Sequence, residues 1–156
     1  MAMAMRQELG DFSSVVCFKA VITGMEDALG EKATAIALIS AGRLRGKNLA
    51  ESLKLADAGL SLDDIAMKLN HALGKEGTRL CLVDKIETSG DLYKVYTRET
   101  ICSAGEDPGS ARQCTFTLGA IQGVLEVVTG KRLRGKHTES VLRGGTHDVM
   151  EFSVLQ

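Results

Sequence analysis

Residues 99–130 read ETICSAGEDPGSARQCTFTLGAIQGVLEVVTG, and the fold is organised around this stretch. Cys102 ends an extended run, and Cys114 opens a helix. The loop between them, SAGEDPGSARQ, consists largely of turn-forming residues and contains the only proline of the chain. The first turn of a helix favours the thiolate form of a cysteine, so Cys114 is predicted to be a better metal ligand or nucleophile than an ordinary buried thiol. The stretch therefore predicts two thiols held at a hinge.

The helix that follows Cys114 has apolar side chains almost all around its circumference, so we expect it to be covered on two sides. Gly119 and Gly123 are four residues apart on one face, where glycine costs helix stability relative to alanine. Such glycines indicate close approach by the backbone of another helix or by a ligand, although tight helix packing alone would also explain them. Gly42 and Gly46 repeat this spacing in an earlier helix, which favours intimate helix contacts, and a dimer interface is one place where such contacts could form.

The composition is that of an ordinary globular chain. Its 156 residues suit one domain that is large enough to bury a hydrophobic core. The 19 basic residues nearly balance the 20 acidic residues, which argues against nonspecific attraction to nucleic acid or to a membrane. Two Tyr, four Phe and no Trp argue against stacking on single-stranded nucleic acid. No apolar run reaches membrane-spanning length, and the leading MAMAM is too short for a signal peptide, so we expect a cytoplasmic protein. Its four cysteines are then expected to be reduced or metal-bound rather than paired as disulfides.

The remaining pattern predicts three helices, a β-hairpin, the glycine-bearing helix and a second hairpin. The expected segments are helices over 11–29 and 33–53, a helix after Ser61, strands over 78–88 and 92–102, and strands over 132–142 and 148–155. Asp11 or Ser13 can cap the first helix, and Ser61 with Asp64 forms a capping box for the third. This order predicts an α+β fold, in which an antiparallel sheet of two hairpins packs with about four helices. The two N-terminal helices are expected at a dimer interface, which makes the protein a homodimer.

Three thiols and a carboxylate are the residues that could carry chemistry. If Gly90 is the centre of the first hairpin turn, residues equidistant from it pair across the strands, and Cys81 lies opposite Glu99. The strand end adds Cys102, and the helix start adds Cys114. Together they could form a closed tetrahedral site for a zinc ion, which would link the hairpin to the helix. Because the spacing is not that of a CxxC knuckle, three ordinary reduced cysteines are the favoured interpretation of the pattern alone.

A family resemblance rests on Glu99-x-x-Cys102, a glycine-containing loop, Cys114-Thr-Phe, and Gly119 and Gly123 ahead of a β-hairpin. This arrangement resembles the 4-vinyl reductase domain, a small-molecule or hydrocarbon-binding module. The superfamily of that domain also contains TRAPP vesicle-tethering subunits, and its fold is similar to that of haem-based nitric-oxide sensors.

The extent of the resemblance implies a domain organisation. It is best over 62–155, and it implies one small-molecule-binding domain over 1–156. Within this domain, 11–55 would be the N-terminal helical part and 61–156 the 4-vinyl-reductase-like part.

The resemblance also implies a metal site. In phenol-sensing bacterial activators of this family, cysteines and a glutamate hold a zinc ion. By this resemblance, Cys81, Glu99, Cys102 and Cys114 are the zinc ligands here. The family name refers to a proposed role in the reduction of chlorophyll-type pigments, but the sequence contains no nucleotide-binding loop and no redox-cofactor motif.

Three functions are compatible with these observations. The first is a non-enzymatic sensor or accessory module that binds a hydrophobic small molecule or acyl chain and carries a structural zinc ion. Its expected pocket residues are Phe116, Ala120, Val124, Val127, Tyr93 and Tyr96. The second is an enzyme or accessory factor that acts on a tetrapyrrole or an aromatic compound, with His137 or His147 as acid, base or axial ligand. The third is an assembly or tethering subunit whose groove takes a protein partner.

The pentapeptide RLRGK occurs twice, over 43–47 and over 132–136. The first copy lies inside a predicted helix and the second enters a predicted strand, so we interpret the repetition as coincidence rather than as an internal repeat. As basic patches both copies are small, and a solvated face is their expected role.

Overall fold

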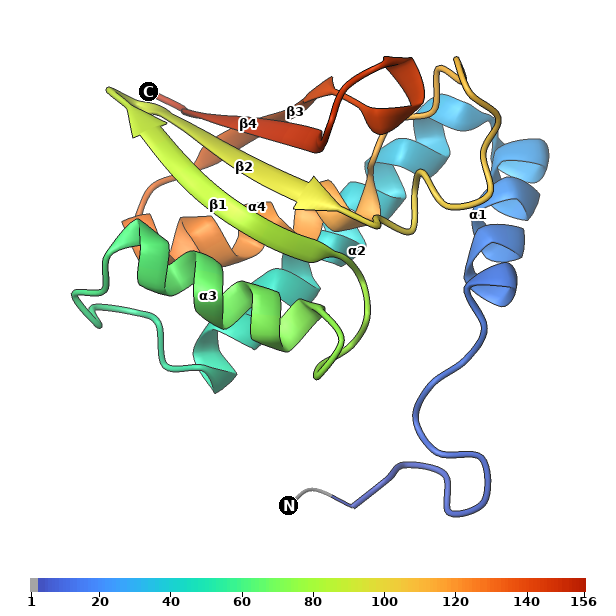
Figure 1. Ribbon diagram of the computed structural model, residues 1–156, viewed down its shortest axis with the longest axis horizontal. Coiled ribbons are helices and arrows are strands. Elements are labelled where there is room, and N and C mark those ends of the chain that lie inside the picture. Colours follow the sequence, from blue (N-terminus) through green and yellow to red (C-terminus); the bar gives the residue numbers. More distant parts are fainter. Residues whose placement is uncertain (1–2) are drawn as a thin grey trace. The chain divides into compact units, whose positions relative to one another are not determined.

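The computed structural model describes residues 3–156, and the chain forms two compact units that divide between Thr34 and Ala35 (Figure 1). The first unit contains α1, Val15–Leu29, and the start of α2, Glu31–Ser52. The second unit contains the rest of α2 and all later elements. These are α3 Leu62–Leu73, β1 Leu82–Ser89, β2 Leu92–Arg98, α4 Phe116–Thr129, β3 Leu133–Glu139, a 3-10 turn Val141–Arg143 and β4 Asp148–Val154. No helix within residues 3–156 is both long enough and apolar enough to cross a membrane.

Serine side chains cap two of the helices. The Ser14 hydroxyl caps α1 by accepting a hydrogen bond of 3.1 Å from the backbone N–H two residues later. The prediction of a helix that starts at residue 11 with Asp11 or Ser13 as its cap is therefore wrong by a few residues. The Ser61 hydroxyl accepts a hydrogen bond of 3.1 Å from the Asp64 N–H at the start of α3, which confirms the predicted cap.

The four strands form one antiparallel sheet in the order β1-β2-β4-β3. β4 is paired on both sides, and its Met150 and Phe152 side chains are fully buried. Two helices, α3 and α4, lie on one face of the sheet, where α3 contacts β1 and α4 contacts β3 (Figure 1). The α+β fold with an antiparallel sheet and four helices confirms the predicted fold class.

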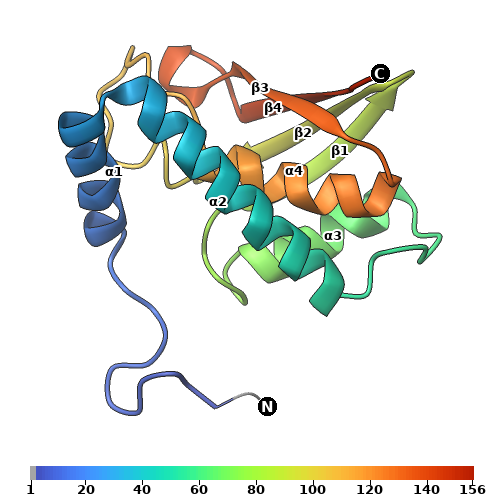
Figure 2. The same ribbon diagram turned by 180° about the vertical axis from the view of Figure 1, so that it is seen from behind.

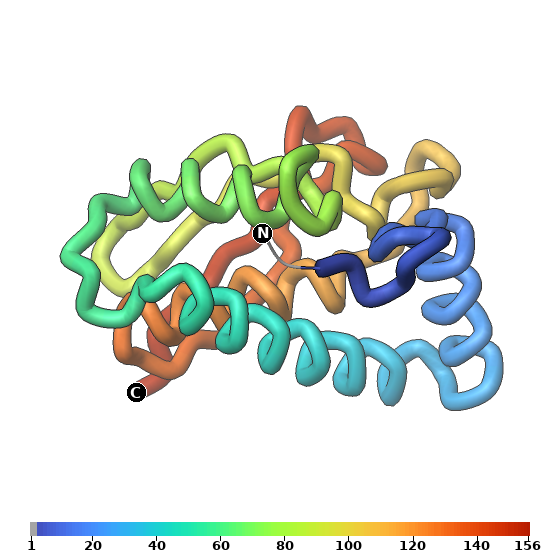
Figure 3. Tube along the Cα trace, turned by 90° about the horizontal axis from the view of Figure 1, so that it is seen from below, coloured from blue at the N-terminus to red at the C-terminus, as the bar shows by residue number. Residues whose placement is uncertain are grey.

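Four glycines bring α2 and α4 into backbone contact (Figures 2 and 3). A Cβ atom placed on Gly42 or Gly46 of α2 would lie 2.1 or 1.9 Å from a carbonyl oxygen of α4. A Cβ atom on Gly119 or Gly123 of α4 would lie 2.2 Å from a carbonyl oxygen of α2. Because no side chain fits into such spaces, only glycine permits this approach. The close contact predicted from the glycine spacing is thus confirmed, and one chain supplies both of its helices.

The first hairpin places Leu82 opposite Arg98 at the end far from the turn. This is the pairing predicted with Gly90 as the centre of the turn. Near the turn the pairing is shifted by one residue, and a β-bulge in β1 absorbs the shift. The next residues beyond the last pair, Cys81 and Glu99, line one cavity, as their predicted proximity requires.

Candidate functional site

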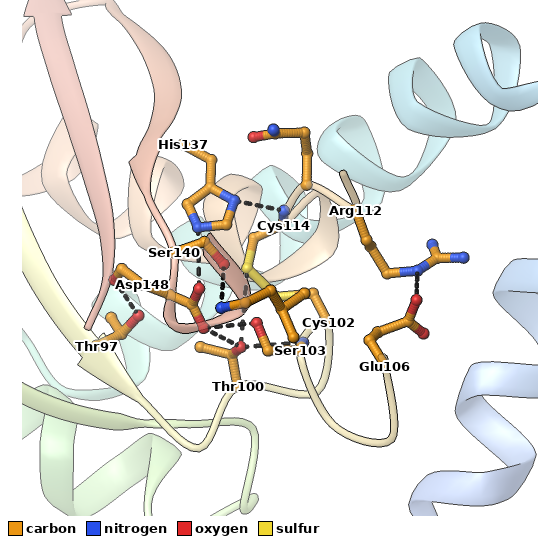
Figure 4. Close-up of a disulfide and its surroundings, with 12 residues drawn as sticks. Thr97, Thr100, Cys102, Ser103, Glu106, Arg112, Cys114, His137, Ser140 and Asp148 are labelled. Atoms are coloured by element: carbon orange, nitrogen blue, oxygen red, sulfur yellow. Dashed lines mark hydrogen bonds and ion pairs between the residues drawn. A yellow bond between two sulfur atoms is a disulfide. The ribbon is translucent and has the colours of Figure 1, made fainter. Parts of the chain in front are cut away.

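The loop over 99–115 connects β2 to α4 and is closed by a disulfide between Cys102 and Cys114 (Figure 4). The Cα atoms of the two cysteines are 5.2 Å apart, and both residues are buried. The expectation of reduced or metal-bound cysteines is therefore not met by this pair. α4 begins at Phe116, so Cys114 precedes the helix instead of opening it as predicted.

Asp148, the first residue of β4, is the polar centre of the site (Figure 4). Its buried carboxylate accepts hydrogen bonds at Oδ2 from the Thr100 hydroxyl at 2.7 Å and from the Ser103 hydroxyl at 2.8 Å. Oδ1 lies 3.1 Å from Nε2 of His137. Burial alone would raise the pKa of Asp148, but the hydrogen bonds from His137, Thr100, Ser103 and Ser140 outweigh it and hold the pKa well below its usual range. The carboxylate is therefore a buried negative charge held by neutral donors.

His137, on β3, connects Asp148 to the disulfide loop. The Cys114 backbone N–H donates a hydrogen bond of 3.0 Å to Nδ1 of His137, so Nδ1 carries no proton. Nε2 must then carry the ring proton, and the Nε2–H group donates a hydrogen bond to the Asp148 carboxylate, which fixes the tautomer of the neutral ring. The His137 side chain is only 2% exposed. A continuous chain of hydrogen bonds thus runs from β4 through β3 to the backbone of Cys114.

This arrangement can serve two chemical purposes. In the oxidised form it fastens the loop to the sheet, because both ring nitrogens of His137 and both carboxylate oxygens of Asp148 take part in hydrogen bonds. In a reduced form it has the donors of a metal site. The Cys114 sulfur, a His137 ring nitrogen and an Asp148 carboxylate oxygen all lie within 4.8 Å of one another.

Cys81 and Glu99 lie at a cavity of about 310 Å³. The other residues that line it are Gly74, Lys75, Arg79 and Leu82. Cys81 is buried, and its burial, together with the negative charge of Asp148, raises the pKa of its thiol to about 12. Glu99 is exposed and has a left-handed backbone with φ 49°. The structure thus brings Cys81 to Glu99 and Cys102 to Cys114, and all three cysteines belong to one buried cluster.

Cysteine alkylation should distinguish these environments. In the native oxidised protein we expect iodoacetamide to modify the exposed Cys17 rapidly and the buried Cys81 very slowly, since a thiol with a pKa of about 12 has almost no thiolate at neutral pH. Cys102 and Cys114 should react only after reduction. Peptide mass spectrometry after timed labelling measures all four. Equal rates at Cys17 and Cys81 would contradict the buried position of Cys81.

The six predicted pocket residues, all on α4 and β2, have different surroundings. They are Phe116, Ala120, Val124, Val127, Tyr93 and Tyr96. Ala120 and Val124 are buried, and their backbone atoms lie against the glycines of α2. Val127 lines a cavity at the end of α4. Phe116 and Tyr93 pack against the core. Tyr96 projects from the opposite face of the sheet, where its hydroxyl donates a hydrogen bond of 3.0 Å to Glu87.

Sequence reasoning did not identify Asp148, Thr100 or Ser103 as site residues. Asp148 is a polar residue at the first position of β4, which is common at strand ends, and Thr100 and Ser103 are polar residues of a loop, so none of the three has a distinctive local signal. His137 was considered only as an acid, base or axial ligand. The other histidine in that role, His147, lies 2.8 Å from the Asp84 carboxylate.

Comparison with known proteins identifies the fold. No protein-family model matches this sequence, and no curated protein matches it. The phenol-responsive sensory domain of the transcription activator PoxR, solved with phenol, is similar with a TM-score of 0.69 and 16% identity, over 91% of this chain and 75% of that chain. A trafficking protein particle complex subunit 3 from Naegleria fowleri, covalently bound to palmitic acid, has a TM-score of 0.60 and 16% identity, over 91% of this chain and 93% of that chain.

These similarities define the class of fold to which the chain conforms. It has the fold shared by the sensory domain and the trafficking subunit, and the sequence resemblance indicated this fold. Sequence identities of 16% establish the fold alone. Membership of the 4-vinyl reductase family remains a prediction.

Proposed function

We propose that this chain is a non-enzymatic binding module for a small, mainly apolar molecule or acyl chain with one polar group, and that it acts as a sensor or accessory protein. The observation that carries this proposal is the cavity at Cys81 and Glu99. Its volume of about 310 Å³ is that of a small ligand site. Leu82 and the uncharged thiol of Cys81 provide an apolar surface. The polar surface comes from the Glu99 carboxylate, which is a hydrogen-bond acceptor, and from Lys75 and Arg79.

The two solved structures support this choice of ligand. One was solved with phenol and the other is covalently bound to palmitic acid, so each holds an apolar body with a single oxygen-bearing group. The alternative of an enzyme acting on a tetrapyrrole or aromatic compound has no comparable support, since both ring nitrogens of His137 and both of His147 already have partners within the chain.

Calorimetric titration with phenol and with a medium-chain fatty acid tests the proposal. We expect at least one of them to bind, and Glu99→Gln to weaken phenol binding about tenfold because a charged acceptor is replaced by a neutral one. Glu87→Gln is the matched control, since Glu87 is an exposed carboxylate on β1 that does not line the cavity. Absence of binding by both probes, or equal effects of the two substitutions, would overturn the proposal.

We propose in addition that the reduced protein binds zinc. The support is the position of the Cys114 sulfur beside His137 and Asp148, to which reduction of the disulfide would add Cys102. Zinc content is measured with and without a reductant. We expect binding only after reduction, and loss of binding in His137→Gln. Loss in Cys81→Ser with retention in His137→Gln would instead favour the ligand set of Cys81, Glu99, Cys102 and Cys114 that the sequence predicts. No uptake by the reduced protein would exclude both sets.

We further propose a homodimer that uses the N-terminal helices. Within residues 3–156, most of the exposed large hydrophobic side chains come before residue 45. Two of them, Ile36 and Leu44, lie on α2 and are 64% and 63% exposed. Analytical ultracentrifugation should show a dimer that Leu44→Glu dissociates. Met67→Glu, at an exposed position of α3, is the control. A monomeric wild type would argue for a protein partner on this face, as in an assembly subunit.

A further inference from the structure

Four cationic side chains surround a cavity of about 570 Å³ at the C-terminal end of α4. Arg43 and Lys47 come from α2, and Lys131 and Arg132 come from the segment between α4 and β3. One carboxylate, that of Glu126, lies among them. The cavity is separate from the one at Cys81, with which it shares no lining residue.

The Glu126 carboxylate is already occupied by two partners. Its Oε1 lies 2.6 Å from Nε of Arg43, and its Oε2 accepts a hydrogen bond of 2.9 Å from the Leu133 N–H. The Glu126 side chain is only 6% exposed, so this ion pair is a fixed part of the wall and contributes little net charge. The net positive charge of the cavity therefore comes from Lys47, Lys131 and Arg132.

None of these three cations forms an ion pair within residues 3–156, although Lys47 is near enough to Glu126 to help lower the pKa of that carboxylate. The helix dipole places about half a negative charge at the C-terminal end of α4, which repels an anion. This charge is smaller than the combined positive charge of the three cations. A group that carries two negative charges would balance the site better than a single carboxylate would. The volume also exceeds what a bare phosphate ion needs, and Val127 offers an apolar contact for whatever carries the charged group.

The two RLRGK segments meet at this cavity. Arg43 and Lys47 are the first and last residues of the first copy, and Arg132 is the first residue of the second. Lys131 and Arg132 are exposed, in agreement with the solvated face that the sequence favoured, and the structure adds that the two copies share this face. The helical spacing of four residues brings Arg43 and Lys47 to one side of α2, and the turn at Gly130 brings Arg132 to the same place.

We propose that this cavity binds the phosphate group of a larger molecule. Lys47, Lys131 and Arg132 hold the phosphate oxygens, and the Arg43–Glu126 pair keeps α2 and α4 in position. A soluble phosphate ester and a phospholipid headgroup with a phosphomonoester share this chemistry.

The test is an NMR titration of the isotope-labelled full chain with inorganic pyrophosphate at constant ionic strength. We expect saturable shifts in the amides of residues 43–47 and 126–132, and at least tenfold weaker binding in Lys47→Gln and in Arg132→Gln. Arg45→Gln is the matched control, because it removes the same charge from the same pentapeptide at an exposed position that does not line the cavity. Melting curves establish that each variant is folded.

A vesicle sedimentation assay distinguishes a soluble phosphate ester from a phospholipid headgroup. It compares binding to phosphatidic acid vesicles with binding to phosphatidylcholine vesicles. Binding of pyrophosphate alone indicates a soluble ester. Binding to phosphatidic acid vesicles that Lys47→Gln and Arg132→Gln abolish indicates a headgroup. The proposal is overturned if neither probe binds, or if Arg45→Gln weakens binding as much as Lys47→Gln does, since binding would then follow overall charge alone.

Discussion

Gly46→Ala is expected to lower the free energy of unfolding by about 3 kcal/mol or more, because overpacking of this severity forces two helix backbones apart. The added methyl group would lie 1.9 Å from the Ala120 carbonyl oxygen, and backbone atoms of a packed helix cannot move aside independently. Helix propensity predicts the opposite sign, since alanine is favoured over glycine by up to about 1 kcal/mol in an open helix. The sign of the change therefore reports directly on the contact between α2 and α4.

Gly24→Ala provides the matched control. Gly24 lies within α1, and a Cβ atom there would meet nothing within 4 Å. We expect this variant to be as stable as the wild type or slightly more stable. Urea denaturation followed by circular dichroism measures both variants. If Gly46→Ala were as stable as Gly24→Ala, the close approach of the helices would be contradicted.

Asp148→Ala is expected to destabilise the protein by about 3 kcal/mol or more, because it leaves several buried donors without an acceptor. Thr100 and Ser103 would lose their shared hydrogen-bond acceptor, and His137 would lose the acceptor for its Nε2–H group. The loop over 99–115 would then be held mainly by its disulfide. We expect the ring nitrogens of His137 in the variant to lose the NMR signature of a single neutral tautomer.

Asp84→Ala is the control, because it removes an exposed carboxylate where Asp148→Ala removes a buried one. Asp84 lies on β1 and pairs with Arg98 and His147 at the surface. Because exposed ion pairs contribute about 0–1 kcal/mol, Asp84→Ala should cost much less than Asp148→Ala. Equal losses of stability in the two variants, measured by thermal melting at one pH, would contradict the role of Asp148 as the centre of the site.

The fold was largely predictable because its signals are local. Ser61 is followed by an acidic first turn and by apolar residues at helical spacing, and all of these lie within a few residues. The hairpin register was also predictable at the end far from the turn, where Leu82 pairs with Arg98, although it depended on two features that compensate. The turn consists of Gly90 and Asp91 instead of being centred on Gly90, and the bulge in β1 restores the predicted pairing at the far end.

The site was less predictable because its contacts join distant parts of the chain. Asp148 meets Thr100 and Ser103 across 48 and 45 residues, and no spacing in the sequence indicates such a meeting. The glycines of α2 and α4 signalled a close approach but not its partner, since a second helix, a ligand and a second copy of the chain all require small residues. The disulfide was not expected, because the sequence was interpreted as that of a cytoplasmic protein, in which thiols are mostly reduced.

The most direct test of the proposed binding function is an amide NMR titration of the oxidised protein with phenol. We predict saturable shifts concentrated at Gly74, Cys81, Leu82 and Glu99, which line the cavity, and much smaller shifts in Glu99→Gln at the same phenol concentrations. Shifts scattered over the surface without saturation, or shifts confined to residues remote from Cys81, would contradict a ligand site in this cavity.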